Sequence, residues 1–245
     1  MFEITSPSNE KFKYFKSLSL KKARQENGEY IVEGIKSVKE ALASGKEISA
    51  VIACKEVLSE FNIKESIPLY IIPQRLAEKL TDTKTPQGVF AVLKIEKKQF
   101  SPKEKGLYVY CDAVSDPGNL GTIIRTADSA GFDGVLLSEA CVDAYNPKTV
   151  RSCMGSFFHL DVFTDIGEDE LIRFKENGGR IYGGILSGET VDYREPTYDG
   201  KIIIAVGNEA NGISEKVKRL CNNDTEELHS HRPGSHERQG DTRHS

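Results

Sequence analysis

The sequence lacks two features typical of membrane and secreted proteins. It contains no run of about 18 apolar residues, the length that a membrane-spanning helix requires, and it does not begin with a basic and then apolar leader. We therefore expect neither a transmembrane helix nor a secretory signal, and the cytoplasm is the expected location. At 245 residues, with 38% hydrophobic and 29% charged residues, the chain has the composition of a soluble globular protein of up to two domains.

Cysteine pairs of the kind that bind metals or form disulfides are also missing. The five cysteines are widely spaced, and none belongs to a CxxC pair. They are Cys54, Cys111, Cys141, Cys153 and Cys221. An odd number of scattered cysteines, several of them inside apolar runs, predicts reduced thiols and neither a disulfide framework nor a metal site.

Excess positive charge is absent overall but present in one segment. The net charge of -4 argues against indiscriminate nucleic-acid binding. Between Lys11 and Arg24, however, basic residues alternate with aromatic ones and no acidic residue occurs. Positive charge beside aromatic rings suits phosphates and unstacked bases. An equally good interpretation is a solvated amphipathic helix with Leu18 and Leu20 turned inward.

A polar linker divides the chain into two α/β units. Residues 96–105 (EKKQFSPKEK) are charged and contain a Ser-Pro step, which is typical of linkers. Short strands and helices before them predict a small α/β domain over residues 1–95. The alternation over residues 106–221 predicts a parallel sheet with helices on both faces. The expected strands of this unit are 107–112, 135–138, 160–163, 180–185 and 201–206, and the expected helices are 120–131, 147–157, 168–176 and 214–221.

The stretch 107–131 predicts a strand, a turn at Pro117 and Gly118, and a helix for which Asn119 is a plausible N-cap. Apolar residues at helical spacing would pack this helix on the sheet. They are Leu120, Ile123, Ile124, Ala127 and Ala130.

Arg125 lies on the polar side of the same helix, one turn after Gly121. The missing side chain of Gly121 would let a ligand or another backbone approach. A helix N-terminus after a strand of an open α/β sheet favours anions, so Arg125 is a candidate active-site residue. The alternative is an exposed ion pair between Arg125 and Asp128.

The stretch 201–214 (KIIIAVGNEANGIS) is a second candidate site. Its apolar residues predict a buried strand that Gly207 converts into a polar loop. Exposed backbone at a strand end, with glycine allowing close approach, can hydrogen-bond an adenine or a ribose. The stretch matches neither GxGxxG nor GxxxxGK[ST], so a Rossmann dinucleotide site and a P-loop are not expected.

The segment 146–156 (NPKTVRSCMGS) predicts another helix, with Asn146 as its cap and Pro147 at its first position. Lys148 and Arg151 on this helix either hold RNA phosphates or are simply solvated, and the segment alone favours the second.

Taken together, NLGTIIRTADSAG and IIIAVGNEANGIS, in this order and about ninety residues apart, resemble two motifs of the SpoU family of S-adenosylmethionine-dependent RNA ribose 2'-O-methyltransferases. The resemblance extends through NPKTVRSCMGS. In the first unit, ITSPSNEKFK, YIVEG and TPQGV are weakly similar to the substrate-binding domain of that family. The similarity covers residues 1–221.

The resemblance implies a methyltransferase domain of the SPOUT type, with a trefoil knot near its C-terminus. It also implies a homodimer with its active site near the subunit interface, S-adenosylmethionine as cofactor, and RNA as substrate, with rRNA favoured over tRNA. By matching motifs, the expected catalytic residues are Asn119, Arg125 and Glu209. The residues expected near the cofactor are Gly184, Ile204, Gly207, Asn208 and Gly212. The residues expected to bind RNA are Lys11, Lys13, Lys21, Lys22, Arg24, Lys148 and Arg151.

The expected chemistry assigns a role to each catalytic residue. The ribose hydroxyl must meet the sulfonium methyl group in line and lose a proton. Arginine is a poor base, so Arg125 would anchor the RNA phosphate and ribose and stabilise the developing alkoxide. Glu209 and Asn119 would orient Arg125 or the hydroxyl, and the proton acceptor is left open.

Residues 222–245 depart from the family. They contain one aliphatic residue and four of the five histidines of the chain, a composition that predicts a disordered tail. The family expects here an apolar strand and a helix that complete the knot. Irregular spacing disfavours a metal-binding tail, and an altered end of the reading frame is favoured. The alternative function is therefore a non-catalytic RNA-binding protein that has lost the cofactor-binding segment.

Overall fold

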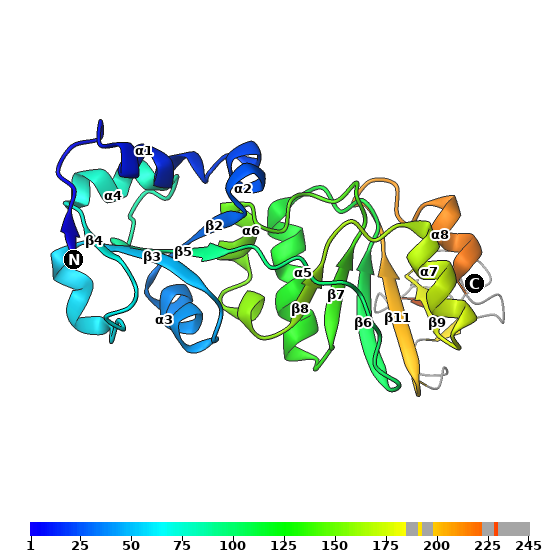
Figure 1. Ribbon diagram of the computed structural model, residues 1–245. Helices are drawn as coiled ribbons and strands as arrows, with labels where there is room; N and C mark the ends of the chain where they lie inside the picture. Colours follow the sequence, from blue (N-terminus) through cyan, green and yellow to red (C-terminus); the bar gives the residue numbers. More distant parts are fainter. Residues whose placement is uncertain (185–190, 193–197, 222–227, 230–245) are drawn as a thin grey trace, which may run out of the picture.

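Two five-stranded sheets, each with its own helices, lie end to end in the molecule (Figure 1). The computed structural model describes residues 1–184, 191–192, 198–221 and 228–229. The N-terminus lies at the far end of the first unit. Within the described part of the chain, no helix is both long and apolar enough to cross a membrane.

The first sheet is mixed, with strand order β1-β4-β3-β5-β2. Its strands are β1 (Phe2–Glu3), β2 (Glu29–Glu33), β3 (Ile48–Ala53), β4 (Leu69–Ile71) and β5 (Val89–Lys94). The helices of this unit are α1 (Glu10–Ser17), α2 (Lys21–Asn27), α3 (Ile35–Ala43) and α4 (Gln74–Leu80), with a 3-10 helix at Lys55–Glu60. Helices α1 and α4 cover one face and α3 covers the other (Figure 1). Alternate residues of the central strands therefore enter two different cores.

The second sheet is entirely parallel, with strand order β8-β7-β6-β11-β9. Its strands are β6 (Gly106–Cys111), β7 (Gly134–Leu137), β8 (Asp161–Phe163), β9 (Arg180–Gly183) and β11 (Lys201–Val206). Helices α5 (Pro117–Ser129) and α6 (Pro147–Ser152), with a 3-10 turn at Ser156–Phe158, belong to one side, and α7 (Glu168–Glu176) and α8 (Glu215–Leu220) to the other. Two short strands, β10 (Val191–Asp192) and β12 (Leu228–His229), pair with each other. The predicted α/β class with a parallel sheet is confirmed.

Helix α5 buries most of the predicted face, including Leu120, Ile124 and Ala127, but the helix ends at Ser129 and Ala130 is exposed. The expected N-cap is also wrong. Its N-cap is Asp116, whose carboxylate accepts a hydrogen bond from the Asn119 amide at 2.8 Å, because Pro117 already occupies the first helical position. The expectation for Gly121 is confirmed in its second form, the close approach of another backbone: a Cβ there would lie 2.4 Å from the Ser152 Cβ and 2.9 Å from the Thr149 carbonyl oxygen of helix α6.

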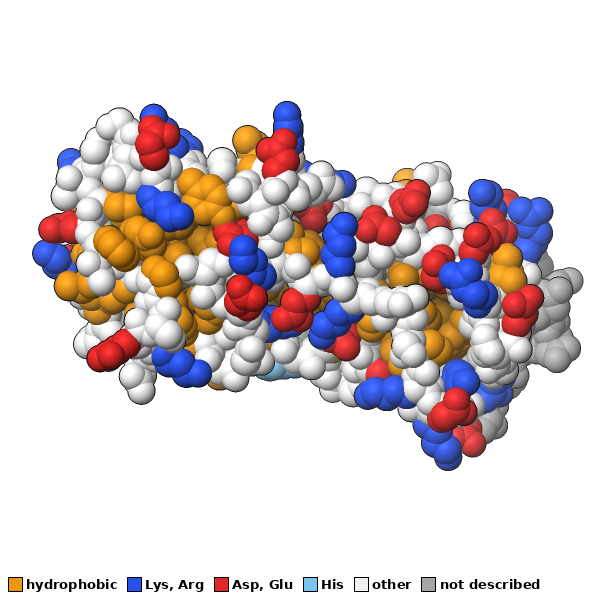
Figure 2. All heavy atoms as spheres, in the orientation of Figure 1, with side chains coloured by type: hydrophobic (Ala, Val, Ile, Leu, Met, Phe, Trp, Pro, Cys, Tyr) orange, Lys and Arg blue, Asp and Glu red, His pale blue; other side chains and the backbone are white. Residues whose placement is uncertain are grey.

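The two units share a core at their junction. Tyr30 of β2 packs against Tyr145 and Phe157 of the second unit, with ring centroids 4.9 and 5.8 Å away. Charged side chains of both signs surround this junction on the face shown in Figure 2. Aromatic burial at the centre and ion pairs at the rim hold the units in one arrangement.

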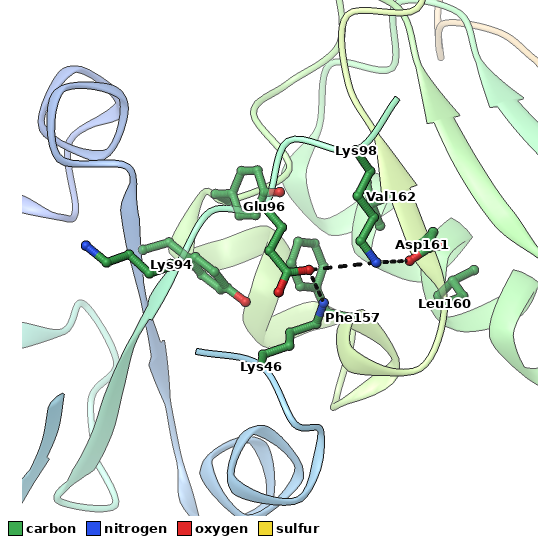
Figure 3. Close-up of a pocket in the computed structure, with 10 residues that line it drawn as sticks. Lys46, Lys94, Glu96, Lys98, Phe157, Leu160, Asp161 and Val162 are labelled. Atoms are coloured by element: carbon green, nitrogen blue, oxygen red, sulfur yellow. Dashed lines mark hydrogen bonds and ion pairs between the residues drawn. The ribbon is translucent and has the colours of Figure 1, made fainter. Parts of the chain in front are cut away.

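The predicted linker is bound to the second unit. The Glu96 carboxylate pairs with the ammonium groups of Lys46 and Lys98, at 3.4 and 3.7 Å. Lys98 also pairs with the Asp161 carboxylate, at 2.5 Å (Figure 3). Phe100 packs its ring against Tyr108 and Phe163, among others. The segment therefore connects the units while packed on them.

The expected basic segment forms helices α1 and α2. Leu18 is fully buried, as the amphipathic interpretation expects, but Leu20 is 64% exposed, so that interpretation is wrong for Leu20. Residues 222–227 and 230–245, which hold most of the predicted disordered tail and the segment expected to close the knot, lie outside the described residues. The tail and the knot stay predictions.

Candidate active site

Three strands of the parallel sheet end side by side at the candidate active site. Strand β11 pairs with β6 on one side and with β9 on the other, so Asp112, Gly207 and Gly184 follow neighbouring strand ends. The Asp112 carboxylate accepts a hydrogen bond from the Ser214 amide at 2.6 Å, and the Gly184 amide donates to the Ala205 carbonyl at 3.0 Å. The carboxyl edge of a parallel sheet is where open α/β folds bind ligands.

The Glu209 carboxylate joins the loop after β11 to the first turn of α5. It accepts hydrogen bonds from the Ser115 hydroxyl at 2.9 Å, the Asp116 amide at 3.2 Å and the Asn119 side-chain amide at 3.0 Å. These donors, the Asn119 side chain foremost, lower the pKa of Glu209 to about 2. Glu209 is therefore ionised at neutral pH, and its oxygens are occupied by the N-terminal turn of α5.

The loop 207–212 closes on itself. The amides of Asn208 and Gly212 each donate to the other residue's carbonyl, at 2.9 and 2.8 Å. A Cβ on Gly207 would lie 2.0 Å from the Gly212 carbonyl carbon, and Gly212 itself has a φ of +68°. Gly207 is therefore needed for the loop to fold, whereas the sequence suggested that its missing side chain admits a ligand.

Among the described residues, the neighbouring strand end leaves room for a ligand. Gly184 is exposed, and a Cβ added to it would meet, of the part of the chain that the structure describes, only the Ala205 carbonyl oxygen, at 3.7 Å. Ile204 on the adjacent strand is half-buried. Open peptide backbone beside an aliphatic side chain fits the adenosyl part of S-adenosylmethionine. Among the described residues no cluster of three or more His, Cys, Asp or Glu side chains is arranged to hold a metal ion.

Arg125 projects from another part of α5. It follows Asn119 by six residues, a rise of about 9 Å and a rotation of about 240° around the helix. Its guanidinium group donates to the Met154 sulfur at 3.1 Å, and Met154 is 51% exposed with a φ of +51°. Asp128, the alternative partner of Arg125, pairs instead with His159 at 3.1 Å. The described chain thus unites Asn119 with Glu209 but does not bring Arg125 to them.

Five of the predicted RNA-binding residues are exposed. Lys11 lies over the Tyr14 ring, 5.0 Å from its centroid, Lys13 pairs with Glu10, and Lys21 and Lys22 lie on α2. Lys148 is also exposed and reaches Asp116 at 3.3 Å. These positions are open to a polyanion.

Two predicted RNA-binding arginines have other partners. Arg24 is 2% exposed, its guanidinium lies 2.5 Å from Asp143, and it also donates to the carbonyls of Leu18 and Ser19. A buried, fully paired guanidinium does not contact RNA, so the prediction for Arg24 is wrong. Arg151 bridges the two units, pairing with Glu33 at 3.1 Å and Asp82 at 3.0 Å.

Sequence reasoning missed three residues that shape this site. Ser115 and Asp116 hold Glu209, and the Asp-Pro step before an apolar helical pattern is a helix-start signal that could have identified Asp116. Met154, the contact of Arg125, carried no comparable signal, because its position depends on a left-handed turn after α6.

Comparisons with known proteins identify the family of the chain. The model of the SpoU rRNA Methylase family matches residues 106–227, and that of the MRM3-like substrate binding domain matches residues 9–91. A Bacillus subtilis protein, 23S rRNA (guanosine(2553)-2'-O)-methyltransferase RlmP, is 35% identical over 213 residues, covering 87% of this chain and 85% of that protein. The mitochondrial rRNA methyltransferase 3A of Danio rerio is 34% identical over 71% of this chain, which spans 45% of that longer protein.

The fold has a solved counterpart. The AdoMet-bound rRNA methyltransferase from Sinorhizobium meliloti superposes with a TM-score of 0.82 and 29% identity, covering 98% of this chain and 92% of that one. The fold is therefore that of a SPOUT methyltransferase. The chain belongs to the SpoU rRNA methylase family, and the predicted resemblance is confirmed.

Proposed function

We propose that this chain transfers a methyl group from S-adenosylmethionine to a ribose 2'-hydroxyl of ribosomal RNA. The observation that carries the proposal is the Glu209 carboxylate, which ties the loop after β11 to the start of α5 at the carboxyl edge of a parallel sheet. Membership of the SpoU family and the likeness to an AdoMet-bound rRNA methyltransferase support the same cofactor and substrate class.

We assign the cofactor to the strand ends of β9 and β11. The exposed backbone of Gly184 and the half-buried Ile204 would hold it, with Gly207, Asn208 and Gly212 as the supporting loop. Bound S-adenosylmethionine supplies an electrophilic methyl group on a sulfonium sulfur. Its transfer to the ribose oxygen would leave the neutral thioether of the cofactor, and the hydroxyl proton would pass to solvent water.

The protein's own groups have separate tasks. Because Glu209 is ionised and occupied by hydrogen-bond donors, it acts as a positioning residue and not as the base. Asn119 shares that task. Arg125 would bind the ribose and phosphate and stabilise the negative charge that develops on the hydroxyl oxygen. The exposed guanidinium, with no ion pair among the described residues, is suited to it.

The separation along α5 between Arg125 and Asn119, the residue that holds Glu209, supports a homodimer, in which Arg125 of one subunit would serve the strand ends of the other. Mixing inactive Arg125→Ala and Glu209→Ala proteins under conditions that exchange subunits tests this arrangement. Random pairing would restore about a quarter of wild-type activity if the residues act across the interface, and none if both act within one subunit.

The first unit, residues 1–95, would bind the RNA, in agreement with the substrate-binding family model that matches most of it. Its exposed lysines Lys11, Lys13, Lys21 and Lys22, with Lys148 of the second unit, would contact phosphates. Since rRNA is the substrate named for the bacterial relative, the cytoplasm is the compartment that fits.

Two measurements test the function. Isothermal calorimetry should detect binding of S-adenosylmethionine, and incubation with methyl-labelled cofactor and ribosomal RNA should yield label in linkages that resist alkali, the signature of 2'-O-methylation. RNA binding without cofactor binding would instead identify a non-catalytic RNA-binding protein.

A further inference from the structure

The two units enclose a groove of about 380 Å³ beside helix α6. We propose that this groove binds the phosphate backbone of an unpaired stretch of the substrate RNA, held by Lys16, Lys79 and Lys148. The inference rests on the proposed function, because it describes how the substrate of that reaction reaches the active site. It uses Lys16, which lies in the basic segment 11–24 but was not among the residues expected to bind RNA, and Lys79, which lies outside that segment.

The three lysines come from three helices that meet at the groove. Lys16 lies on α1, Lys79 on α4 and Lys148 at the start of α6, and all three are exposed. Among the described residues, neither Lys16 nor Lys79 forms an ion pair, whereas Lys148 has one contact, with Asp116. Ammonium groups on flexible stems act as point charges for phosphates, so their convergence favours a polyanion.

The two acidic residues of the groove, Glu33 and Asp82, already have ion-pair or hydrogen-bond partners. Glu33 pairs with Arg151 at 3.1 Å and accepts hydrogen bonds from the hydroxyls of Thr81 and Thr83 at 2.5 and 2.7 Å. Asp82 pairs with the other end of the same guanidinium at 3.0 Å. Arg151 therefore compensates one of the two negative charges in the groove wall, and the three lysines outnumber the one that remains.

The groove continues to the candidate active site through Lys148. The Lys148 ammonium lies 3.3 Å from Asp116, whose amide donates to Glu209 at 3.2 Å. Both side chains of the Lys148–Asp116 pair are about half exposed, and such pairs contribute little in water. A phosphate can therefore compete for Lys148 next to the residues that would hold the reacting ribose.

The walls of the groove indicate what it recognises. Among the described residues, its one aromatic residue, Phe90, is buried, as are Ile31 and Leu80, so the groove offers no open aromatic ring face on which a base could stack. Contacts through lysine and phosphate alone carry no sequence information. The groove would thus hold and direct the strand, and the choice of nucleotide would be made elsewhere.

The salt dependence of RNA binding tests the proposal. Binding of a short fluorescein-labelled RNA hairpin with an unpaired loop is measured by anisotropy over a series of salt concentrations. Each lysine that contacts a phosphate of single-stranded RNA adds about 0.7 to the slope of log affinity against log salt. We expect the Lys16→Gln/Lys79→Gln protein to lose about 1.4 from that slope and to bind more weakly at low salt.

The matched control removes two exposed lysines outside the groove. Lys36 lies on α3, across the first sheet from α1, and Lys64 lies in the loop before β4. The Lys36→Gln/Lys64→Gln protein has the same net charge as the test protein, and its slope should equal that of the wild type. An unchanged slope in the groove variant, or an equal loss in the control, would overturn the proposal.

Methyl transfer separates this proposal from the proposed function. In the groove variant we expect a higher KM for RNA with kcat retained at saturating RNA, because neither lysine contacts the reacting atoms. Normal methylation together with an unchanged slope would refute the groove alone. If the wild-type protein methylates no RNA but the groove variant shows the predicted loss of slope, the proposed function is refuted and the groove proposal is supported.

Discussion

Asn119 donates a side-chain hydrogen bond to Glu209 at 3.0 Å, although the two residues lie 90 positions apart. This contact connects the two segments from which the sequence predicted an active site. It also accounts for the low pKa of Glu209, since the Asn119 amide is the largest of the influences that stabilise the carboxylate.

The first prediction concerns pH. Because folding lowers the pKa of Glu209 from 4.5 to about 2, its ionised form stabilises the fold above pH 4.5, and this contribution is lost as pH falls toward 2. The unfolding free energy of Glu209→Gln should therefore depend less steeply on pH in that window than that of the wild type. Parallel urea titrations across the window make the measurement, and identical pH profiles for both proteins would contradict it.

The second prediction concerns Arg24. Replacing this buried guanidinium with Met leaves Asp143 without its partner, so Arg24→Met should lower the unfolding free energy by about 3 kcal/mol. The control is Lys22→Met on the same helix, where an exposed contact to Glu26 at 3.8 Å is lost and we expect a change below about 0.5 kcal/mol. Equal effects in chemical denaturation would show that Arg24 is not a structural residue.

The third prediction concerns His159, which lies between Asp128 of α5 and Glu40 of α3, 3.1 Å from each. Both carboxylates raise its pKa, Asp128 the more strongly. The stabilisation by protonated His159 is complete below about pH 6.5 and is lost as pH rises through the raised value. NMR titration should show the imidazole titrating above the ordinary range and shifting down in Asp128→Asn. A His159 pKa at or below the ordinary histidine value would show that His159 does not bridge Glu40 and Asp128.

Much of the second unit could be predicted because its signals are local. The run 201–206 is strand β11 as expected, and 168–176 is helix α7, since apolar spacing and flanking turn residues lie within each segment. The same holds for the Asn146 cap and for Pro147 at the first position of α6. The functional resemblance depended likewise on contiguous motifs.

The errors concern residues whose partners are distant in the chain. Arg24 was assigned to a basic surface, yet its carboxylate partner lies 119 residues away in the other unit. The pattern left open whether a ligand or another backbone approaches Gly121, and it is helix α6, which periodicity alone does not place there, that fills this space with Ser152. Local pattern supplies the spacing of side chains along an element, while tertiary packing decides what each of them meets.

The most direct test of the account is the rate of methyl transfer by Arg125→Ala, measured in a single turnover at saturating RNA and S-adenosylmethionine. If Arg125 acts on the ribose and phosphate in the transition state, the variant should bind RNA within about tenfold of the wild type but lose at least about 99% of the rate. A rate close to that of the wild type would remove Arg125 from the mechanism and with it the active site described above.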